Sequence, residues 1–401
     1  MVRYGRATPQ FSMRLSRVAY GSRLNESPPR TPRTSLRPLT VAPTQTASAT
    51  DDDDVQRVAA LAAAREQIIE AIRRKVVGQD EVIEQLLVAL FAGGHCLLVG
   101  VPGLAKTLMV HALADALSLD FTRVQFTPDL MPSDITGADV FYEDKATGER
   151  AFRFVPGPIF ANVLLADEIN RTPPKTQAAL LEAMQERQVT AGGKRHPLPS
   201  PFFTLATQNP IDQEGTYPLP EAQLDRFMMQ VNVVYPNEAE ELEIVRRTTA
   251  DTLEAIQPVL SAEEIAEHTR LVRRTPIAPH IDQFAVTLVR KSRHDQPEAP
   301  EYIREFVRWG AGPRASQWLV LAAKARATLS GRYSVDIDDI RAMAAPVLRH
   351  RIKTNFSADA EGVTPDDLIA RLMKDTPDVP DRKIGGARLS SLFAAGNDRQ
   401  P

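Results

Sequence analysis

Residues 100–107 contain two glycines and end in a lysine followed by a threonine, as phosphate-binding loops do. They lie between an apolar run at 95–99 and a helical pattern at 108–117. In that setting, backbone N–H groups at the start of a helix would face phosphate oxygens. Lys106 would reach the outer phosphates of a nucleotide, and the Thr107 hydroxyl would bind Mg²⁺. The predicted nucleotide-binding residues of this region are Gly100, Val101, Pro102, Gly103, Leu104, Ala105, Lys106, Thr107 and Leu108.

Ala105 stands where the pattern G-x-x-x-x-G-K-[ST] has its last glycine. Alanine is tolerated there if its φ angle is negative. We therefore expect a negative φ at Ala105 and a functional variant of the loop. The alternative is an accidental turn of glycine and proline that happens to precede a lysine.

Two adjacent carboxylates, Asp167 and Glu168, follow a second apolar run at 162–166. Ligand sites of α/β proteins lie at the carboxyl ends of such buried parallel strands. We expect Asp167 to help hold Mg²⁺ and Glu168 to polarise the attacking water. A strand followed by an acidic helix start is the alternative. Asn209, after the apolar run 202–207, would lie between the acidic pair and the γ-phosphate, unless it is a plain turn asparagine.

Apolar strands and amphipathic helices alternate around these motifs, which favours a parallel sheet. Asp80 is expected to cap the second helix. A polar segment with glycine, 143–149, separates two alternating runs and predicts an inserted β-hairpin. The expected elements are helices at 55–75, 81–91, 108–117 and 175–188, strands at 95–99, 121–126, 162–166, 202–207 and 228–235, and hairpins at 138–155 and 189–198.

After residue 235 the chain shows helical periodicity only. Ser261 and Glu264 have the spacing of a capping box, and Pro313 suits the first turn of a helix that carries Arg314 just inside it. The expected helices are 238–249, 261–273, 280–292, 313–329 and 335–350, with a short one from 364 to about 374.

Composition narrows the function classes. The 401-residue chain has a formal net charge of −3, but eight Arg against one Glu give residues 1–50 about +7, so the rest carries about −10. A body of that sign disfavours general nucleic-acid binding. The single cysteine, Cys96, allows no internal disulfide, which suits a reducing, cytoplasmic location. No apolar run reaches 18 residues, and the scattered histidines predict no structural zinc.

Residues 1–54 are rich in Pro, Ser, Thr and Arg and have no hydrophobic periodicity. We expect a disordered, flexible extension. An organelle transit peptide and an upstream start codon that lengthens the true protein are the alternatives.

Together these motifs resemble the AAA+ ATPases and, among them, the MoxR family. The resemblance covers about residues 55–355 and includes alanine at position 105. The stretch 213–227 is the longest match. Further matching segments are 77–79, 100–107, 130–137, 154–158, 165–171, 206–210, 312–316 and 346–351.

The resemblance implies a role for each matching residue. Lys106 and Thr107 belong to Walker A, Asp167 and Glu168 to Walker B, and Asn209 is similar to sensor 1. Arg226 resembles the arginine finger supplied to a neighbour's nucleotide. Arg314 resembles sensor 2, acting in cis or in trans. Gly78 and Gln79 would line the adenine side. Arg171 would face a neighbouring site or form a local salt bridge.

The resemblance also implies the fold and domain boundaries. We expect an α/β, parallel-sheet P-loop AAA+ core with a helix-2 β-hairpin insert, followed by an all-α lid domain. The expected boundaries are 1–54 for the disordered extension, 55–235 for the core, 236–358 for the lid, and 359–401 for a short helix and flexible tail.

The function implied is Mg²⁺-dependent ATP hydrolysis by a hexameric ring that acts as a chaperone-like remodelling or maturation factor. Its partners would be protein clients or von Willebrand factor A domain proteins. The alternatives are a nucleic-acid-directed motor and a slow nucleotide-gated switch. The 138–155 hairpin carries four acidic and three basic residues, so it is not basic, which favours a protein partner.

Overall fold

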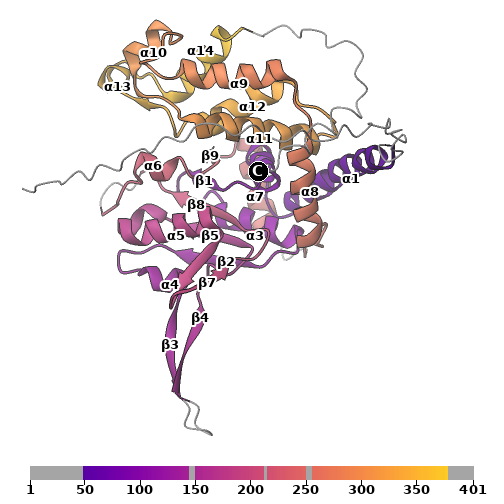
Figure 1. Cartoon of the computed structure of the whole chain (residues 1–401), viewed down its shortest axis with the longest axis vertical. Coiled ribbons are helices and arrows are strands. Elements are labelled where there is room, and N and C mark those ends of the chain that lie inside the picture. The colour runs from indigo at the N-terminus through magenta and orange to yellow at the C-terminus, as the bar shows by residue number, and fades with distance from the viewer. Residues whose placement is uncertain (1–47, 144–149, 212–214, 250–254, 378–401) are drawn as a thin grey trace, which may run out of the picture. The chain divides into compact units, whose positions relative to one another are not determined.

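A five-stranded parallel sheet with the strand order β2-β5-β8-β1-β9 lies at the centre of the α/β core (Figure 1). The computed structural model describes residues 48–143, 150–211, 215–249 and 255–377, and the statements below concern these residues. Residues 1–47 of the expected extension and 378–401 of the expected C-terminal segment lie outside them. The strands are β1 Cys96–Val99, β2 Phe121–Gln125, β5 Val163–Asp167, β8 Phe203–Gln208 and β9 Met229–Asn232.

The strand register brings the three predicted motifs to one edge of the sheet. Val99 pairs with Gln208, and Gln125 pairs with Asp167. Because all five strands are parallel, the phosphate loop after β1, the acidic pair at the end of β5 and Asn209 after β8 follow carboxyl ends that lie side by side.

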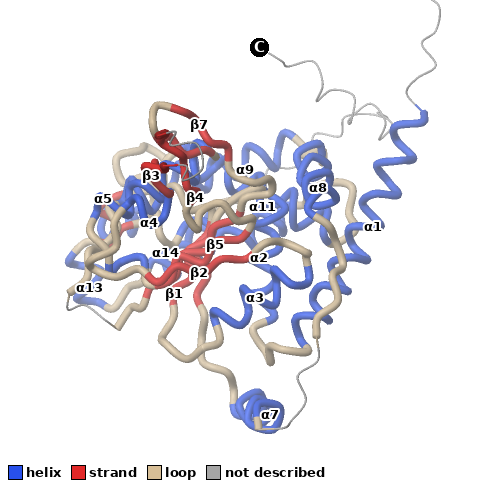
Figure 2. Tube along the Cα trace, turned by 90° about the horizontal axis from the view of Figure 1, so that it is seen from below, coloured by secondary structure: helices blue, strands red, loops and turns tan. Residues whose placement is uncertain are grey.

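Helices cover both faces of the sheet. Leu97 and Leu98 are neighbours in β1 and belong to different buried clusters, because successive side chains of a strand point to opposite faces. α2 (Asp80–Ala92) and α3 (Lys106–Ala116) pack with the Leu98 cluster, and α5 (Pro174–Glu186) packs with the Leu97 cluster (Figure 2).

The first two helices differ in detail from the predictions. α1 spans Ser48–Arg73 and begins seven residues before the predicted start. The prediction that Asp80 caps α2 is wrong. Gln79 is the N-cap, in a left-handed conformation with φ 61°, and Asp80 is the first helical residue. The Asp80 carboxylate instead accepts a hydrogen bond of 2.9 Å from Arg73.

Both predicted hairpins are present. The first follows α4 (Pro132–Thr136) and consists of β3 (Gly137–Glu143) and β4 (Arg150–Pro156), which extend away from the sheet (Figure 1). The second, β6 (Gln188–Ala191) with β7 (Lys194–Pro197), turns at Gly192-Gly193, where both glycines have positive φ angles. The tip of the first hairpin lies outside the described residues.

The C-terminal part is largely helical, and its main helices match the predictions within two residues. Ser261 and Glu264 form the predicted capping box, and Gly312 precedes Pro313 as N-cap. The helices are α7 Glu238–Thr248, α8 Ala262–Arg274, α9 Pro279–Lys291, α10 Glu301–Phe306, α11 Pro313–Leu329, α12 Ile337–Leu348, α13 Phe356–Glu361 and α14 Pro365–Asp375.

The prediction of an all-α lid is wrong in one respect. β10 (Val307–Trp309) and β11 (Lys353–Thr354) pair antiparallel within the lid. Strands of two or three residues are too short to show a period of two in the sequence. Of the helices that the structure describes, none is long and apolar enough to cross a membrane.

Candidate nucleotide-binding site

A hollow of about 450 Å³ lies at the carboxyl edge of the sheet and gathers the predicted motifs. Its wall contains the five side chains predicted to act on phosphate, metal or water within their own chain: Lys106, Thr107, Asp167, Glu168 and Asn209. The lining residues are Pro102, Gly103, Ala105, Lys106, Thr107, Leu108, Arg123, Gln125, Asp167, Glu168, Thr207 and Asn209.

Lys106 is the first residue of α3 and lies half-buried in the hollow. Its Nζ donates a hydrogen bond of 2.5 Å to the carbonyl oxygen of Gly100 across the loop. Burial lowers the pKa of Lys106, and the nearby charges of Asp167 and Glu168 oppose that shift. The ammonium therefore lies beside the acidic pair on one wall of the hollow.

The expectation of a negative φ at Ala105 is wrong. Ala105 is the N-cap of α3 and has φ 52° and ψ 22°, which is the left-handed region. The chain leaves the loop and enters the helix through this single residue, so the backbone there needs a conformation that glycine adopts freely. An alanine in that conformation costs roughly 1–2 kcal/mol.

Side chains from β2, from β8 and from the short helical turn after β5 hold the acidic pair. Thr207 donates a hydrogen bond of 2.6 Å to Asp167 Oδ1, and Arg123 donates one of 3.0 Å to Oδ2. Glu168 has φ 57°, and its Oε2 accepts a hydrogen bond of 3.0 Å from Gln125 and forms a salt bridge of 2.9 Å with Arg171. Of the two alternatives for Arg171, the structure contains the local salt bridge.

Sequence reasoning missed Arg123, Gln125 and Thr207. The sequence does show that these residues are polar and lie in predicted strands. In the folded sheet, those strands are the two neighbours of β5, and the polar residues lie beside its acidic end. Gln125 lies directly opposite Asp167, and Thr207 follows Ala206, the partner of Ala166. These positions can be recognised only once the strand order is known.

Asn209 is buried, and its Oδ1 accepts a hydrogen bond of 3.1 Å from the Ile211 N–H. With the carboxamide oxygen engaged in this local turn, the NH₂ group is the end that can donate into the hollow. The turn geometry and a role toward phosphate are therefore compatible, and the role stays a prediction.

The remaining loop residues border a second hollow of about 380 Å³, whose lining includes Gly100, Val101 and Leu104. Gly78 and Gln79 line neither hollow. Gln79 Nε2 donates a hydrogen bond of 2.8 Å to the Val234 carbonyl oxygen, and Val234 does line the second hollow.

Arg226 and Arg314 lie away from the phosphate loop of their own chain. Both line a small cavity together with His95, which precedes β1, and Arg226 itself precedes β9. They are therefore at the amino edge of the sheet, whereas the loop is at the carboxyl edge. A strand of four residues alone separates these edges by about 10 Å.

A purely structural role for Arg226 would be a salt bridge to one of the nearby carboxylates, Asp225 or Glu221. Within the described residues, Arg226 makes no salt bridge. The Asp225 carboxylate is instead shared by Arg314, at 3.1 Å, and Arg351, at 2.8 Å.

Comparisons with known proteins agree with this geometry. The model of the ATPase family associated with various cellular activities (AAA) matches residues 95–229, and that of the AAA lid domain matches 301–372. Chaperone MoxR1 of Mycobacterium tuberculosis is 41% identical over 309 residues, which are 77% of this chain and 81% of the relative. The chain belongs to the MoxR family of AAA ATPases.

Other relatives support the same assignment. Protein MoxR of Methylorubrum extorquens is 33% identical over 297 residues, covering 70% of this chain and 85% of the relative. The crystal structure of a Cytophaga hutchinsonii protein described as a candidate ATPase matches with a TM-score of 0.77 and 39% identity, covering 82% of this chain and 99% of that one. This MoxR-family chain is thus an ATP hydrolase with the predicted AAA+ fold.

Proposed function

We propose that this MoxR-family ATPase hydrolyses ATP with Mg²⁺ in a ring of identical subunits and remodels protein clients in a chaperone-like manner. The observation that carries the proposal is the gathering of Lys106, Thr107, Asp167, Glu168 and Asn209 around one hollow. Phosphoryl transfer needs those groups together, since its catalysis is mostly positioning and charge stabilisation.

The donor set suits magnesium. Mg²⁺ takes oxygen ligands and is commonly held by one or two carboxylates together with substrate phosphates. The Thr107 hydroxyl and the Asp167 carboxylate face the same hollow and would hold the ion, which would neutralise phosphate charge. Thr207 and Arg123 orient Asp167, and Arg123 would yield Oδ2 to a metal there.

Each side chain around the hollow would have a separate role in hydrolysis. Lys106 would bind the outer phosphates, and the Asn209 NH₂ group would contact the γ-phosphate. Glu168 would accept a hydrogen bond from the attacking water and align it. Gln125 and Arg171 fix the Glu168 carboxylate at the rim of the hollow, so the water position would be set before the nucleotide binds.

Arg226 and Arg314 support assembly. Because both lie at the amino edge of the sheet, they would serve the nucleotide of a second copy, with Arg226 as arginine finger and Arg314 as sensor 2 in trans. The same contact repeated head to tail forms a ring when its rotation closes, and we propose the closed form. A count of six subunits is proposed from the family resemblance.

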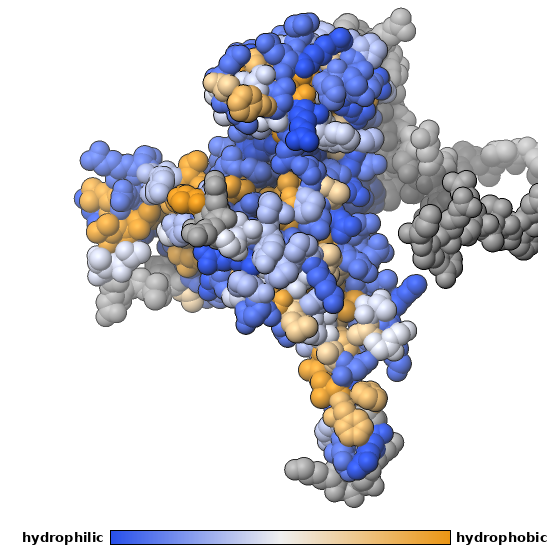
Figure 3. Space-filling view, turned by 90° about the vertical axis from the view of Figure 1, so that its left-hand side faces the viewer, coloured by the Kyte–Doolittle hydropathy of each residue, from blue (hydrophilic) through white to orange (hydrophobic). Residues whose placement is uncertain are grey.

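The β3–β4 hairpin supports a protein client. Five of its apolar side chains are exposed, and Phe141 and Phe152 pack edge to face with ring centroids 5.7 Å apart. Figure 3 shows these apolar residues gathered on the hairpin. Its described charges balance, with Asp139 and Glu143 against Arg150 and Arg153. The exposed apolar residues are Val140, Phe141, Tyr142, Phe152 and Val155.

An arm with exposed apolar side chains and balanced described charges fits peptide segments better than a phosphate backbone, which requires an excess of cations. Clients or von Willebrand factor A domain partners would therefore bind through protein contacts. Capture with a Glu168→Gln variant loaded with ATP, compared with a Phe141→Ser/Phe152→Ser variant, tests this. Recovery of nucleic acid in place of protein would favour the motor alternative.

The biochemical test is phosphate release by the purified full chain. We expect turnover that requires Mg²⁺ and that Lys106→Ala abolishes together with ATP binding. Unchanged ATP affinity of Lys106→Ala in calorimetry would contradict the site. Tight ATP binding by the unmodified chain with barely measurable turnover would favour the nucleotide-gated switch.

A further inference from the structure

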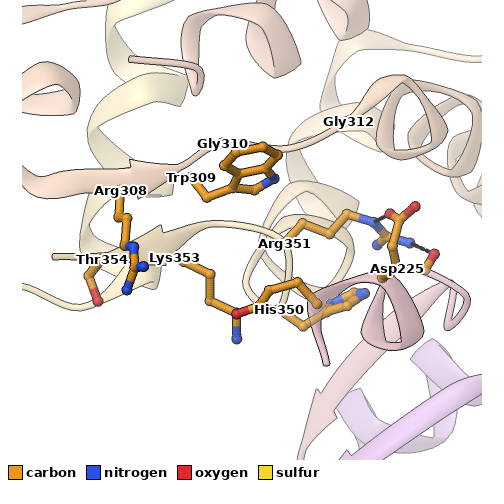
Figure 4. Close-up of a pocket in the computed structure, with 11 residues that line it drawn as sticks. Asp225, Arg308, Trp309, Gly310, Gly312, His350, Arg351, Lys353 and Thr354 are labelled. Carbon is orange, nitrogen blue, oxygen red and sulfur yellow. Dashed lines mark hydrogen bonds and ion pairs between the residues drawn. The ribbon is translucent and has the colours of Figure 1, made fainter. Parts of the chain in front are cut away.

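A cavity of about 690 Å³, larger than the hollow at the phosphate loop, lies between the core and the lid. One wall is the start of α6 (Glu221–Leu224) with Asp225, and the other is the β10–β11 pair of the lid. Figure 4 shows the Trp309 indole on the lid wall and the Arg351 side chain reaching Asp225 on the core wall. Trp309 is 65% exposed, which is unusual for so large an apolar side chain.

The charged residues of the cavity fall into two groups. Arg351 is buried, and its guanidinium donates to the Asp225 carboxylate at 2.8 Å and to the Met228 carbonyl oxygen at 3.0 Å, so its charge is compensated. Arg308 and Lys353 make no salt bridge within the described part of the chain. With Glu221 as the remaining carboxylate at the rim, the uncompensated side chains carry a net positive charge beside an exposed indole.

Helix α7 has the complementary surface. Glu238, Glu241, Leu242 and Val245 recur at i, i+3, i+4 and i+7, so they lie on one face of the helix. All four are exposed, Leu242 by 51% and Val245 by 53%. None of the α7 residues, all of them described, is buried, and Figure 2 shows the helix standing clear of its neighbours.

Contacts to the core nevertheless fix the position of α7. Arg247 donates a hydrogen bond of 2.8 Å to the Arg73 carbonyl oxygen, and the Glu240 carboxylate lies against Gly78, where a Cβ atom would approach it to 2.7 Å. A helix that is held at both ends while its apolar face stays uncovered has a surface prepared for a partner.

The sheet topology places the two surfaces for contact between copies. α7 follows the carboxyl end of β9, on the side of the phosphate loop. The cavity adjoins Asp225 and Gly312, next to Arg226 and Arg314 at the amino edge. A head-to-tail contact that brings Arg226 to a neighbour's phosphate loop therefore brings the cavity toward that neighbour's α7.

We propose that this cavity binds helix α7 of a second copy of the chain, with Glu238 and Glu241 toward Arg308 and Lys353, and Leu242 and Val245 against Trp309. The inference rests on the head-to-tail assembly of the proposed function. It adds that the lid of one subunit binds α7 of the next subunit, the helix that follows the carboxyl end of β9.

Charge reversal tests the pairing. Glu238→Lys/Glu241→Lys and Arg308→Glu/Lys353→Glu should each raise the dissociation constant of the assembly about tenfold or more in sedimentation velocity, because like charges would meet. Combining the two pairs of changes should restore assembly. Glu263→Lys/Glu267→Lys on α8 is the matched control, with the same charge change on exposed residues and no expected effect. Full assembly of both reversed variants would overturn the proposal.

Cross-linking provides a second measurement that does not depend on charge. Cys96 is fully buried and has a pKa raised above the usual thiol range, so engineered cysteines react alone. The full chain with Leu242→Cys and Trp309→Cys, treated with a short bismaleimide, should give a ladder of covalent oligomers. A control with Leu242→Cys and Val286→Cys on α9 should give none.

The outcomes separate the two proposals. If Arg226→Ala and Lys106→Ala subunits complement each other in mixtures but the Leu242→Cys/Trp309→Cys variant gives no ladder, the α7 contact is wrong and the trans-acting finger stands. If neither complementation nor cross-linking is found, the head-to-tail assembly itself is wrong.

Discussion

Glu168 has its carboxylate fixed by two neighbours, Gln125 and Arg171. A glutamine at this position keeps the shape of the side chain but loses the charge that, in the proposed mechanism, would polarise the attacking water. We expect Glu168→Gln to bind ATP with near-normal affinity and to lose roughly 10²-fold or more in turnover. Calorimetry and phosphate release measure the two quantities, and a loss of ATP binding would give Glu168 a structural or metal-binding role instead.

Ala105 offers a test of backbone strain in the loop. Ala105→Gly relieves the left-handed strain but adds chain entropy to the unfolded state, so the free energy of unfolding should rise by at most about 1 kcal/mol. Ala105→Val should lower it by more than about 1 kcal/mol, since a β-branched residue is worse at positive φ. Urea unfolding of both variants measures this, and equal stability of the two would contradict the strain.

His95 makes folding sensitive to acid. Thr204 N–H donates to Nδ1 at 3.0 Å, so the neutral ring carries its proton on Nε2, which faces the Met184 carbonyl oxygen. Complete burial lowers the pKa of His95 from 6.5 to about 4. Between about pH 6.5 and pH 4, His95 is therefore protonated in the unfolded chain but stays neutral in the folded chain.

The folded state therefore loses stability as the pH falls from about 6.5 toward 4. Between pH 7.5 and pH 5 the loss from this one group is about 2 kcal/mol. Urea unfolding at the two pH values measures it, and His95→Asn, whose amide oxygen can replace Nδ1 as acceptor, should show a correspondingly smaller loss. An unchanged pH dependence in that variant would contradict the assignment.

At the scale of single residues, types and order along the chain were enough to place Lys106, Thr107, Asp167, Glu168 and Asn209 around one hollow. Their supporting partners could not be predicted in the same way. Arg123 and Asp167 are 44 residues apart, and the hydrogen bond between them depends on strand order and register. The φ angle of Ala105 depends on how the loop meets α3, which a residue type does not determine.

At the scale of elements, long periodic segments were predicted well. α11 spans Pro313–Leu329, as its apolar spacing and its proline at the first turn indicated. Elements without a repeating signal were missed. β10 and β11 exist because the segments 307–309 and 353–354 pair across the lid, and neither is long enough to show a pattern alone.

The segment between α6 and β9 is held by the lid through Arg351. Besides the Asp225 carboxylate, this buried guanidinium donates to the carbonyl oxygens of Phe227 and Met228, the two residues that directly follow Arg226. Without this guanidinium, Asp225 keeps its salt bridge to Arg314, but the buried carbonyl oxygens of Phe227 and Met228 lose this donor. Because a buried acceptor without a partner costs about 1–3 kcal/mol, we expect Arg351→Met to lower the free energy of unfolding by roughly 2–4 kcal/mol.

A matched variant separates burial from charge in that prediction. Arg290→Ala removes a salt bridge to Glu298 of similar length, 2.7 Å, between side chains that are each about two-fifths exposed. Its cost should stay below about 1 kcal/mol. Urea unfolding measures the free energy of unfolding of both variants. Similar losses would show that Arg351 does not anchor the segment between α6 and β9.

At the scale of the whole molecule, the parallel sheet separates the proposed catalytic groups into two sets. The phosphate loop, acidic pair and Asn209 occupy the carboxyl edge, while Arg226 and Arg314 occupy the amino edge. A single chain therefore lacks a complete site under this account. An arginine finger contributes roughly 10³–10⁵ in rate in phosphoryl-transfer enzymes, so hydrolysis should depend on assembly.

The central claim is that Arg226 completes the site of a neighbouring subunit, and mixing variants tests it most directly. Arg226→Ala subunits keep their own loop, and Lys106→Ala subunits keep their own finger. Each alone should be inactive. Where an Arg226→Ala loop meets a Lys106→Ala finger, a complete composite site forms, and phosphate release should reappear in the mixture.

The matched control mixes Arg226→Ala with a subunit that carries both Lys106→Ala and Arg226→Ala, because that mixture contains no complete site. The account predicts phosphate release well above both parents in the first mixture and none in the control. If subunits exchange and fold normally, yet the first mixture stays as inactive as its parents, Arg226 does not act in trans and the account is contradicted.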